Sequence, residues 1–399
     1  MDRRYQFNRM EFAGALGDLG TLLPLAIGLI FVNGLSPSGL FLSVGLYYIF
    51  SGVYFGVTVP VQPMKVISAY AIATAMSAQQ ILASGAMMGL LLLIIGATGA
   101  ITFIGKRIPK SVVRGVQLST GILLTAGGVR FMIGTSEFQR LRQMAEPYLS
   151  IQDLGPLPIG ILLGVIGCVL VFLLMENKRV PAGLLVVLGG IVVGLVFGTH
   201  EGAEQMRLGL NLPPILPFGI PSKVDFAFAL FALVLPQIPM TLGNAVVAYV
   251  DLSKEYFPDR SDKITYKSAC ISMAIANFLA FFLGGMPLCH GAGGLAAHYR
   301  FGARTGGSNL IIGIIFVLLA VLLGNHALFV VKLLPMSVLG VLLLFAGGQL
   351  ALTLIDVDGR KDLFVALIML GITLASNLAV GFIAGIAIAY VLRWNRLTV

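Results

Sequence analysis

A stretch rich in proline interrupts what should be a membrane-spanning segment. Residues 57–65 read Val-Thr-Val-Pro-Val-Gln-Pro-Met-Lys and lie between two long apolar segments. β-Branched residues and two prolines predict extended chain, and Pro63 suits the first turn of a following helix. A helix start at mid-membrane presents unpaired N–H groups and partial positive charge, to which Lys65 adds a full charge. This combination predicts an anion site in a protein-covered cavity.

A second interrupted stretch follows in the other half of the chain. Residues 284–291 read Gly-Gly-Met-Pro-Leu-Cys-His-Gly and precede helix-compatible residues. We therefore predict that Pro63 and Pro287 occupy equivalent places, that each starts a half-helix, and that the two starts face one another. We also expect matching polar breaks in two other helices, at residues 17–21 and 236–240. Paired interrupted segments are typical of a transporter's binding site.

The candidate substrate-binding residues lie in these four stretches. They are Gly20, Thr21, Gln62, Pro63, Met64, Lys65, Gln237, Thr241, Asn244, Pro287, Leu288, Cys289, His290 and Gly291. Gln62 and Gln237 can donate amide N–H groups to an oxyanion or bond between helices. Lys65 either faces the site or snorkels. Asp18 is expected to pair with Lys65, to cap a helix or to couple protons, and His290 to touch substrate or to bond a freed carbonyl.

The composition indicates a polytopic membrane protein. Of 399 residues, 58% are hydrophobic and 11% charged, and no soluble domain buries that much apolar surface. The net charge of +9 is spread among short loops, so no nucleic-acid partner is expected. The three cysteines and four histidines show no metal or catalytic spacing. We therefore expect no enzyme activity, metal, cofactor or disulfide, and the chain shows no cleavable signal peptide.

Fourteen apolar segments can be identified, seven on each side of a polar stretch at residues 199–223. They lie at about 10–32, 38–56, 57–76, 80–104, 111–133, 157–175, 180–198, 225–250, 265–283, 284–302, 309–325, 327–350, 362–376 and 378–393. An odd number per half predicts two inverted repeats in an all-α polytopic fold. The expected domains are core at 1–104 and 222–326, and gate at 105–221 and 327–399.

The distribution of basic residues predicts the orientation. With a cytoplasmic N-terminus, nineteen of the 26 lysines and arginines fall in inner loops or at the termini. This is the asymmetry that the positive-inside rule describes. We therefore expect both termini to be cytoplasmic, in a multi-pass protein of a prokaryotic inner membrane.

Four motifs resemble the molybdate transporter family, a branch related to the sulfate permeases. Residues 12–24, Phe-Ala-Gly-Ala-Leu-Gly-Asp-Leu-Gly-Thr-Leu-Leu-Pro, resemble its opening signature, and residues 60–65, 236–245 and 287–294 resemble its later motifs in the same order. The resemblance implies the seven-plus-seven inverted-repeat fold that sulfate permeases share with nucleobase transporters, with a core moving against a gate. It favours molybdate over sulfate as substrate. The C-terminal regulatory domain usual in larger sulfate permeases is expected to be absent.

The sequence thus predicts a secondary transporter of a tetrahedral oxyanion that works by elevator-like alternating access. A nucleobase carrier is disfavoured because no acidic residue stands at Gln237, and an anion channel because paired broken helices do not make a continuous polar path. Segments five to seven and twelve to fourteen show almost no polar residues at depth. They are expected to form a scaffold in the lipid bilayer, and their apolar faces could pair two copies into a homodimer.

Overall fold

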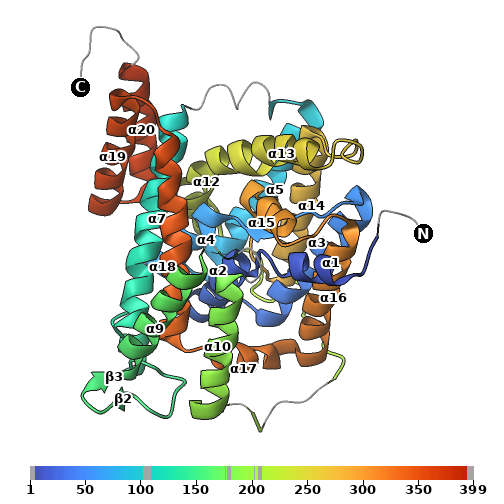
Figure 1. The fold of residues 1–399 in the computed structure, drawn as a ribbon. Coiled ribbons are helices and arrows are strands. Elements are labelled where there is room, and N and C mark those ends of the chain that lie inside the picture. Colours follow the sequence, from blue (N-terminus) through green and yellow to red (C-terminus); the bar gives the residue numbers. More distant parts are fainter. Residues whose placement is uncertain are drawn as a thin grey trace.

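The computed structural model describes residues 5–101, 109–175, 177, 181–201, 203–204 and 209–392. Its helices form two groups, which stand to the left and right of Figure 1. The left-hand group comprises α7 (Lys110–Met132), α9 (Ile159–Leu174), α10 (Ala182–Phe197), α18 (Met336–Ala351), α19 (Arg360–Ala375) and α20 (Leu378–Val391). Helix α7 packs along both α18 and α19. These helices lie within residues 105–221 and 327–399, for which the role of a gate stays a prediction.

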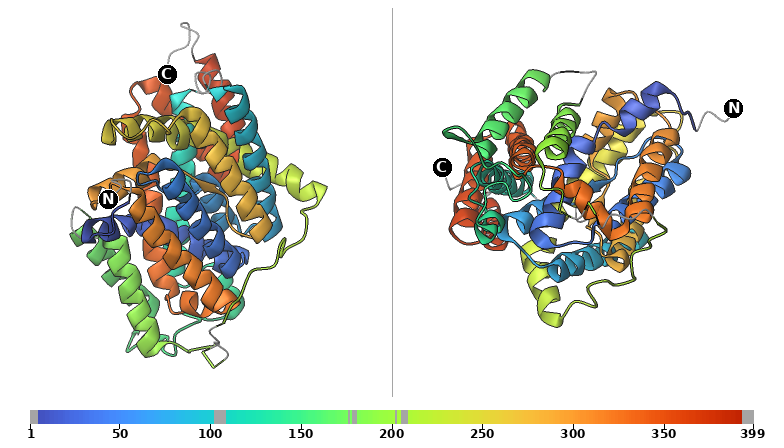
Figure 2. Two further views of the ribbon diagram at one scale, coloured as in Figure 1. Left: turned by 90° about the vertical axis from the view of Figure 1, so that its right-hand side faces the viewer. Right: turned by 90° about the horizontal axis from the view of Figure 1, so that it is seen from below.

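The right-hand group contains the elements of the predicted core. They are α1 (Arg9–Ala15), α2 (Leu19–Asn33), α3 (Pro37–Phe55), β1 (Gln62–Pro63), α4 (Lys65–Thr74), α5 (Ala78–Thr98), α11 (Lys223–Ala229), π-helix η1 (Leu230–Val234), α12 (Leu235–Met240), π-helix η2 (Thr241–Ala248), α13 (Tyr249–Tyr256), α14 (Tyr266–Leu283), β4 (Leu288–Cys289), α15 (Ala292–Arg300) and α16 (Gly306–Leu323). Helix α3 packs along α16, and α5 along α14. Figure 2 shows both groups from two further directions.

Short elements lie between the longer helices. They are α8 (Glu137–Arg142), β2 (Asp153–Leu154), β3 (Leu157–Pro158), the 3-10 turns η3 (Gly324–His326) and η4 (Leu352–Asp356), and α17 (Ala327–Lys332). Two of them, η3 and α17, lead from α16 of the right-hand group to α18 of the left-hand group. Within the described residues, eight helical runs are long and apolar enough to cross a membrane, and α9, α10 and α20 are shorter apolar helices. The chain is thus a mostly helical multi-pass protein. Fourteen segments in two inverted repeats stay a prediction.

Glycines explain why α7 and α18 pack so closely. A Cβ built on Gly128 would lie 2.5 Å from the carbonyl oxygen of Gly340, and the reverse distance is also 2.5 Å. Gly121 and Gly347 oppose each other in the same way, two turns along each helix. Small residues on facing sides let membrane helices approach to backbone contact, where many weak contacts add up. The pair α7–α18 therefore makes a rigid centre for its group.

Two predicted segments differ from the structure. The segment expected at 327–350 is two helices, α17 and α18, because Pro335 lies between them and α18 begins after it. The polar break expected at residues 236–240 is also wrong. There the chain is helical without interruption from α11 to α13. The π turns η1 and η2 flank the prolines of α12, because proline has no N–H group to donate to the regular α-helical hydrogen bonds. The break at residues 17–21 is present, because α1 ends at Ala15 and α2 begins at Leu19.

Both half-helices start later than their prolines. Helix α4 begins at Lys65 and α15 at Ala292, so the predicted starts at Pro63 and Pro287 are wrong. The intervening residues form β1 and β4, which pair antiparallel with Gln62 opposite Cys289. The Met64 N–H also donates to the Pro287 carbonyl at 2.9 Å, which extends the pairing. Pro63 lies opposite Leu288, so the two prolines do not face one another in the strand pair.

Candidate substrate site

Two asparagines satisfy the extended backbone before the half-helices. Asn309 of α16 accepts from the Val59 N–H at 2.9 Å and donates to the Val59 carbonyl at 2.8 Å. Asn277 of α14 does the same for Leu288, at 3.1 and 2.8 Å. These bonds explain how extended chain stays buried at membrane depth. Sequence analysis missed both residues, although a lone asparagine in an apolar helix is a signal for such a bond.

His290, in the second extended stretch, forms a hydrogen bond with the backbone of the first. Its Nδ1 lies 2.9 Å from the carbonyl oxygen of Pro60, and its Nε2 lies 2.6 Å from the Tyr47 hydroxyl and 3.0 Å from that of Ser272. The carbonyl can only accept, so Nδ1 carries the proton and Nε2 accepts. The ring is also stacked between Tyr47 and Tyr249. Of the two alternatives for His290, the structure shows the bond to a freed carbonyl.

The start of α4 is capped by the amide of Gln237. Its Oε1 accepts from the N–H groups of Val66 at 3.0 Å and Ile67 at 3.1 Å, and its Nε2 donates to Thr241 at 2.9 Å. Gln237 and Thr241 are both buried. The α4 dipole is thus met by a neutral oxygen of the protein itself. The amide N–H of Gln237 that was expected to face an oxyanion is engaged between helical turns instead.

Among the described residues, no side chain accepts a hydrogen bond from the first N–H groups of α15. Beside this helix start, Gln62 Nε2 donates to Asp18 Oδ1 at 2.7 Å. The other oxygens, Gln62 Oε1 and Asp18 Oδ2, are buried and have no hydrogen-bond partner in the described part of the chain. A Cβ on Gly294 would lie 2.6 Å from Asp18 Oδ2, and one on Gly291 would clash with Gln62 Oε1. Glycine is therefore required for α15 to approach these two side chains.

Lys65 is the first residue of α4 and is partly exposed. It forms no hydrogen bond, and no ion pair within 4 Å, with any residue that the structure describes. Asp18 accepts a hydrogen bond from Gln62 and its charge interacts with that of Lys65, although the charged atoms of Asp18 and Lys65 are not within 4 Å of each other. The pairing of Asp18 with Lys65 stays a prediction. Asp18 makes no side-chain cap at the start of α2, so the capping alternative fails. The ammonium of Lys65 remains available to a ligand.

Open space adjoins the α15 start. A Cβ on Gly293 of α15 or on Gly243 of η2 would meet no heavy atom within 4 Å. The expected site residues divide accordingly. Partly exposed are Gly20, Thr21, Lys65 and Asn244, whereas Gln62, Pro63, Met64, Gln237, Thr241, Pro287, Leu288, Cys289, His290 and Gly291 are buried. The structure thus brings the four stretches together, since Gln62 bonds to Asp18 and Gln237 bonds to the start of α4. Asn244 also lies near Gly291.

The two groups of helices meet next to these residues. A Cβ on Gly183 at the start of α10 would lie 2.7 Å from the Cα of Gly20. Helix α2 also packs against α18, and α4 against α7. In α7, the buried Gln117 lies with its Nε2 3.0 Å from the sulfur of Met240 in α12. One buried polar side chain of α7 therefore lies at the contact between the two groups.

Comparison with known proteins identifies the family. The family described as "Molybdate transporter of MFS superfamily" matches residues 10–124 and 229–350. The chain belongs to the molybdate transporter family. It is 31% identical to molybdate transporter 1 of Arabidopsis thaliana, over 97% of this chain and 88% of that one. Molybdate transporter 1 of Chlamydomonas reinhardtii is 28% identical, over 96% of this chain and 91% of that one. The resemblance seen in the sequence motifs is thus confirmed.

Solved structures show the same fold. The transmembrane domain of the cyanobacterial bicarbonate transporter BicA matches 96% of this chain and 98% of its own, with a TM-score of 0.65 and 16% identity. The anion transporter SLC26A9 from mouse matches 99% of this chain and 70% of its own, with a TM-score of 0.67 and 13% identity. The matched relatives are named as transporters, which agrees with the expectation that the chain is no enzyme. They come from a plant and an alga, so they do not support a prokaryotic inner membrane.

Proposed function

We propose that this protein is a secondary active transporter of molybdate. The observation that carries the proposal is the start of α15, a helix terminus that no described side chain caps and that lies beside open space. The ammonium of Lys65 and the amide of Asn244 are partly exposed members of the same stretches. A helix terminus and a lysine both favour a compact anion. Membership of the molybdate transporter family supports molybdate over sulfate.

Elevator-like alternating access is the movement that we propose. In each of two packed pairs, one helix comes from each half of the chain: α3 of the first half packs along α16 of the second, and α5 of the first packs along α14 of the second. This exchange of contacts between the halves supports two inverted repeats. The site lies on elements of 1–104 and 222–326, which we propose as the moving core. Residues 105–221 and 327–399 would form the gate. The contact of Gly20 with Gly183 is made by backbone alone, and such a smooth contact lets one group slide along the other.

Proton coupling through Asp18 follows from its place beside the α15 start. A dianion bound there would repel an ionised carboxylate, because little water screens the two charges. Protonation of Asp18 would remove that repulsion. The Asp18→Asn variant, neutral at every pH, should bind molybdate but lose the stimulation of uptake by an inward proton gradient. Stimulation equal to that of the parent would refute this coupling.

Uptake into vesicles containing the purified protein tests the whole proposal. Radiolabelled molybdate and sulfate are compared side by side, each with the other as unlabelled competitor. Preloading the vesicles with unlabelled molybdate should accelerate entry of the label, because a carrier exchanges ions and a channel does not. Faster uptake of sulfate would reassign the substrate. Absence of counterflow in an active preparation would replace the carrier with a channel.

A further inference from the structure

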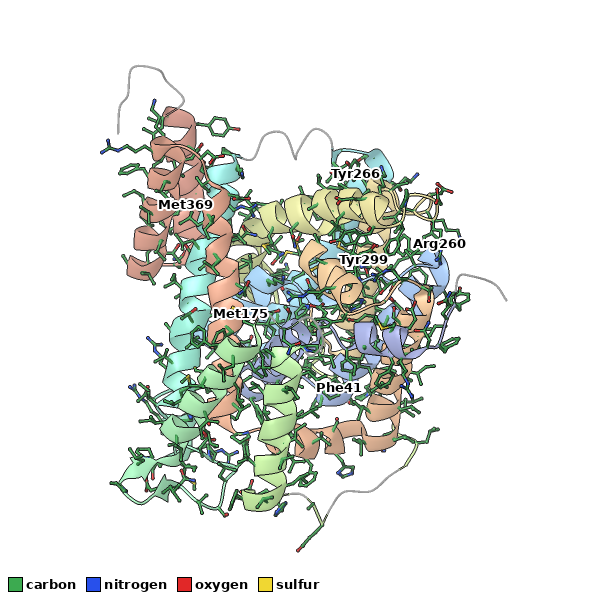
Figure 3. All side chains as sticks on the ribbon, viewed as in Figure 1. Phe41, Met175, Arg260, Tyr266, Tyr299 and Met369 are labelled. Atoms are coloured by element: carbon green, nitrogen blue, oxygen red, sulfur yellow. The ribbon has the colours of Figure 1, made fainter. Side chains whose placement is uncertain are left out.

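A cavity of about 380 Å³ lies where the end of α3 meets the start of α14. Phe50, Tyr54 and Ile275 form an apolar wall, while Lys263 and Lys267 belong to the polar wall. Arg260 and Tyr266, labelled in Figure 3, mark this corner of the molecule. None of the candidate substrate-binding residues lines this cavity, although its lining residue Ser272 contacts His290.

The apolar wall continues into two faces that the described residues leave uncovered. On α3, Leu46, Phe50 and Val53 are 36%, 40% and 54% exposed and follow one helical stripe. On α14, Ile275 and Phe282 are each 46% exposed. Both helices are apolar enough to span a bilayer, so acyl chains are the natural cover for these faces.

The polar wall carries net positive charge. Lys263 donates to the Tyr54 carbonyl at 3.1 Å and lies 5.5 Å over the ring of that residue, which keeps its ammonium at the cavity and leaves two N–H donors. Lys267 is exposed and has no partner among the described residues. Asp262 is the one acidic side chain among the lining residues. Thr265, also in the lining, begins α14 at the positive end of its dipole.

We propose that this cavity binds an anionic phospholipid. The phosphate would meet Lys263 and Lys267, and one acyl chain would lie along Phe50 and Ile275. A soluble anion would leave the apolar wall uncovered, and a lipid without net charge would leave the excess positive charge unpaired. Aromatic side chains such as the stacked pair Phe50 and Tyr54, with ring centroids 6.0 Å apart, are typical of the level at which headgroups meet acyl chains.

The cavity also reaches the hydrogen bonds of His290, which hold the extended stretch before β1. Ser272, one of its lining residues, lies 3.0 Å from His290 Nε2, and the same ring holds the Pro60 carbonyl. Only one side chain therefore separates a bound lipid from the extended stretch that precedes β1. We expect occupancy to raise the melting temperature of the protein, because it supports this framework.

The test uses the full chain in nanodiscs of phosphatidylcholine, with or without phosphatidylglycerol. Native mass spectrometry counts the phosphatidylglycerol retained by the parent and by the double variant Lys263→Gln/Lys267→Gln. Loss of two lysines near a membrane surface should weaken retention about 30-fold. The control is Lys254→Gln/Lys361→Gln, which removes equal charge on the same predicted membrane face but outside the cavity. It should retain the lipid as the parent does.

Three results would overturn the proposal: no retained phosphatidylglycerol in the parent, equal retention in parent and double variant, or equal loss in both double variants. The melting temperature separates the lipid from a free anion. Phosphatidylglycerol should raise it in the parent and in the control. If inorganic phosphate in phosphatidylcholine nanodiscs raised it equally, the site would belong to a soluble anion. These outcomes leave the transport proposal untouched, because no residue of the substrate site is altered.

Discussion

The two half-helices begin side by side, yet their first turns are built differently. Helix α4 has its N–H groups covered by Gln237, an amide from another element. Helix α15 has no side-chain cap from any residue that the structure describes, and glycines bring it against Gln62 and Asp18. Sequence symmetry suggested two equal anion-binding ends facing each other. In the structure, the first N–H groups of α4 are bonded to Gln237, whereas those of α15 adjoin open space. Lys65 is the first residue of α4, the helix whose N–H groups are already bonded.

If the proposed anion site is correct, this difference gives the two helices separate tasks. The α4 start supplies a fixed side-chain charge, while its backbone donors are used internally. The α15 start supplies backbone donors and free space. An anion bound there would receive a helix dipole from one half of the chain and an ammonium from the other. Variants that affect one helix start should therefore differ in kind from those that affect the other.

The largest effect is expected from Lys65→Ala. Loss of a charged hydrogen-bond donor in a poorly hydrated site should weaken molybdate binding by about 10- to 100-fold. Equilibrium binding of labelled molybdate to the purified variant measures this directly. Lys65→Arg keeps the charge and should recover part of the affinity. Binding by Lys65→Ala equal to that of the parent would make the lysine structural and remove the proposed contribution of α4.

A smaller loss is expected from Gly294→Ala. The new methyl would lie 2.6 Å from Asp18 Oδ2 and 2.8 Å from Gln62 Nε2, so α15 must retreat or the pair must separate. Such overpacking costs about 1–3 kcal/mol in stability. Since α15 can relieve part of this by a small shift, we expect uptake to fall about fivefold, which corresponds to about 1 kcal/mol. Gly127→Ala in α7 is the control, because its Cβ would meet nothing within 4 Å. Uptake by Gly294→Ala at the control rate would contradict the close approach.

The sequence allowed most of the fold to be predicted, because apolar length and helix punctuation are local properties. The extended stretches before the half-helices and the break at Asp18 follow from proline and glycine. The hydrogen-bond partners of the buried polar side chains could not be predicted from the sequence. Asp18 accepts a hydrogen bond from Gln62, 44 residues away, and Gln237 caps a helix about 170 residues away. Those pairings depend on how the chain segments around β1 and β4 are placed in space. Strands of two residues are too short to show a sequence pattern from which their register could be predicted.

A moderate effect on stability is expected from Gln237→Met. It removes the cap and leaves the N–H groups of Val66 and Ile67 unsatisfied, at a cost of about 1–2 kcal/mol in the free energy of unfolding. Molybdate affinity should change less than about threefold, because the bound anion uses the other helix start. Thermal unfolding and binding are measured together, with the exposed Gln79→Met as control. A loss of affinity as large as in Lys65→Ala would place Gln237 in contact with substrate and end the contrast between the helices.

The smallest effect extends the comparison to a helix start in the gate. Helix α18 is capped by a carboxylate, since Glu146 accepts from the N–H groups of Met336 at 2.7 Å and Ser337 at 2.8 Å. Glu146 lies in the connection after α8, outside the membrane-spanning helices, and it is buried. Burial raises its pKa from the usual 4.5 to about 6, although the bonds from Ser337 and Met336 oppose the shift.

The pH dependence of Glu146 has a definite sign. Because its pKa is higher in the folded protein, protonation favours folding, fully below about pH 4.5 and progressively less as the pH rises through 6. The whole change is about 2 kcal/mol at most. Glu146→Gln cannot titrate, so its melting temperature should vary less than that of the parent between these pH values. Glu137→Gln, exposed on α8, should follow the parent. If the melting temperature of Glu146→Gln depended on pH as strongly as that of the parent, the titration of Glu146 would not contribute to stability. The carboxylate that caps α18 would then differ from the amide that caps α4 without any effect on folding.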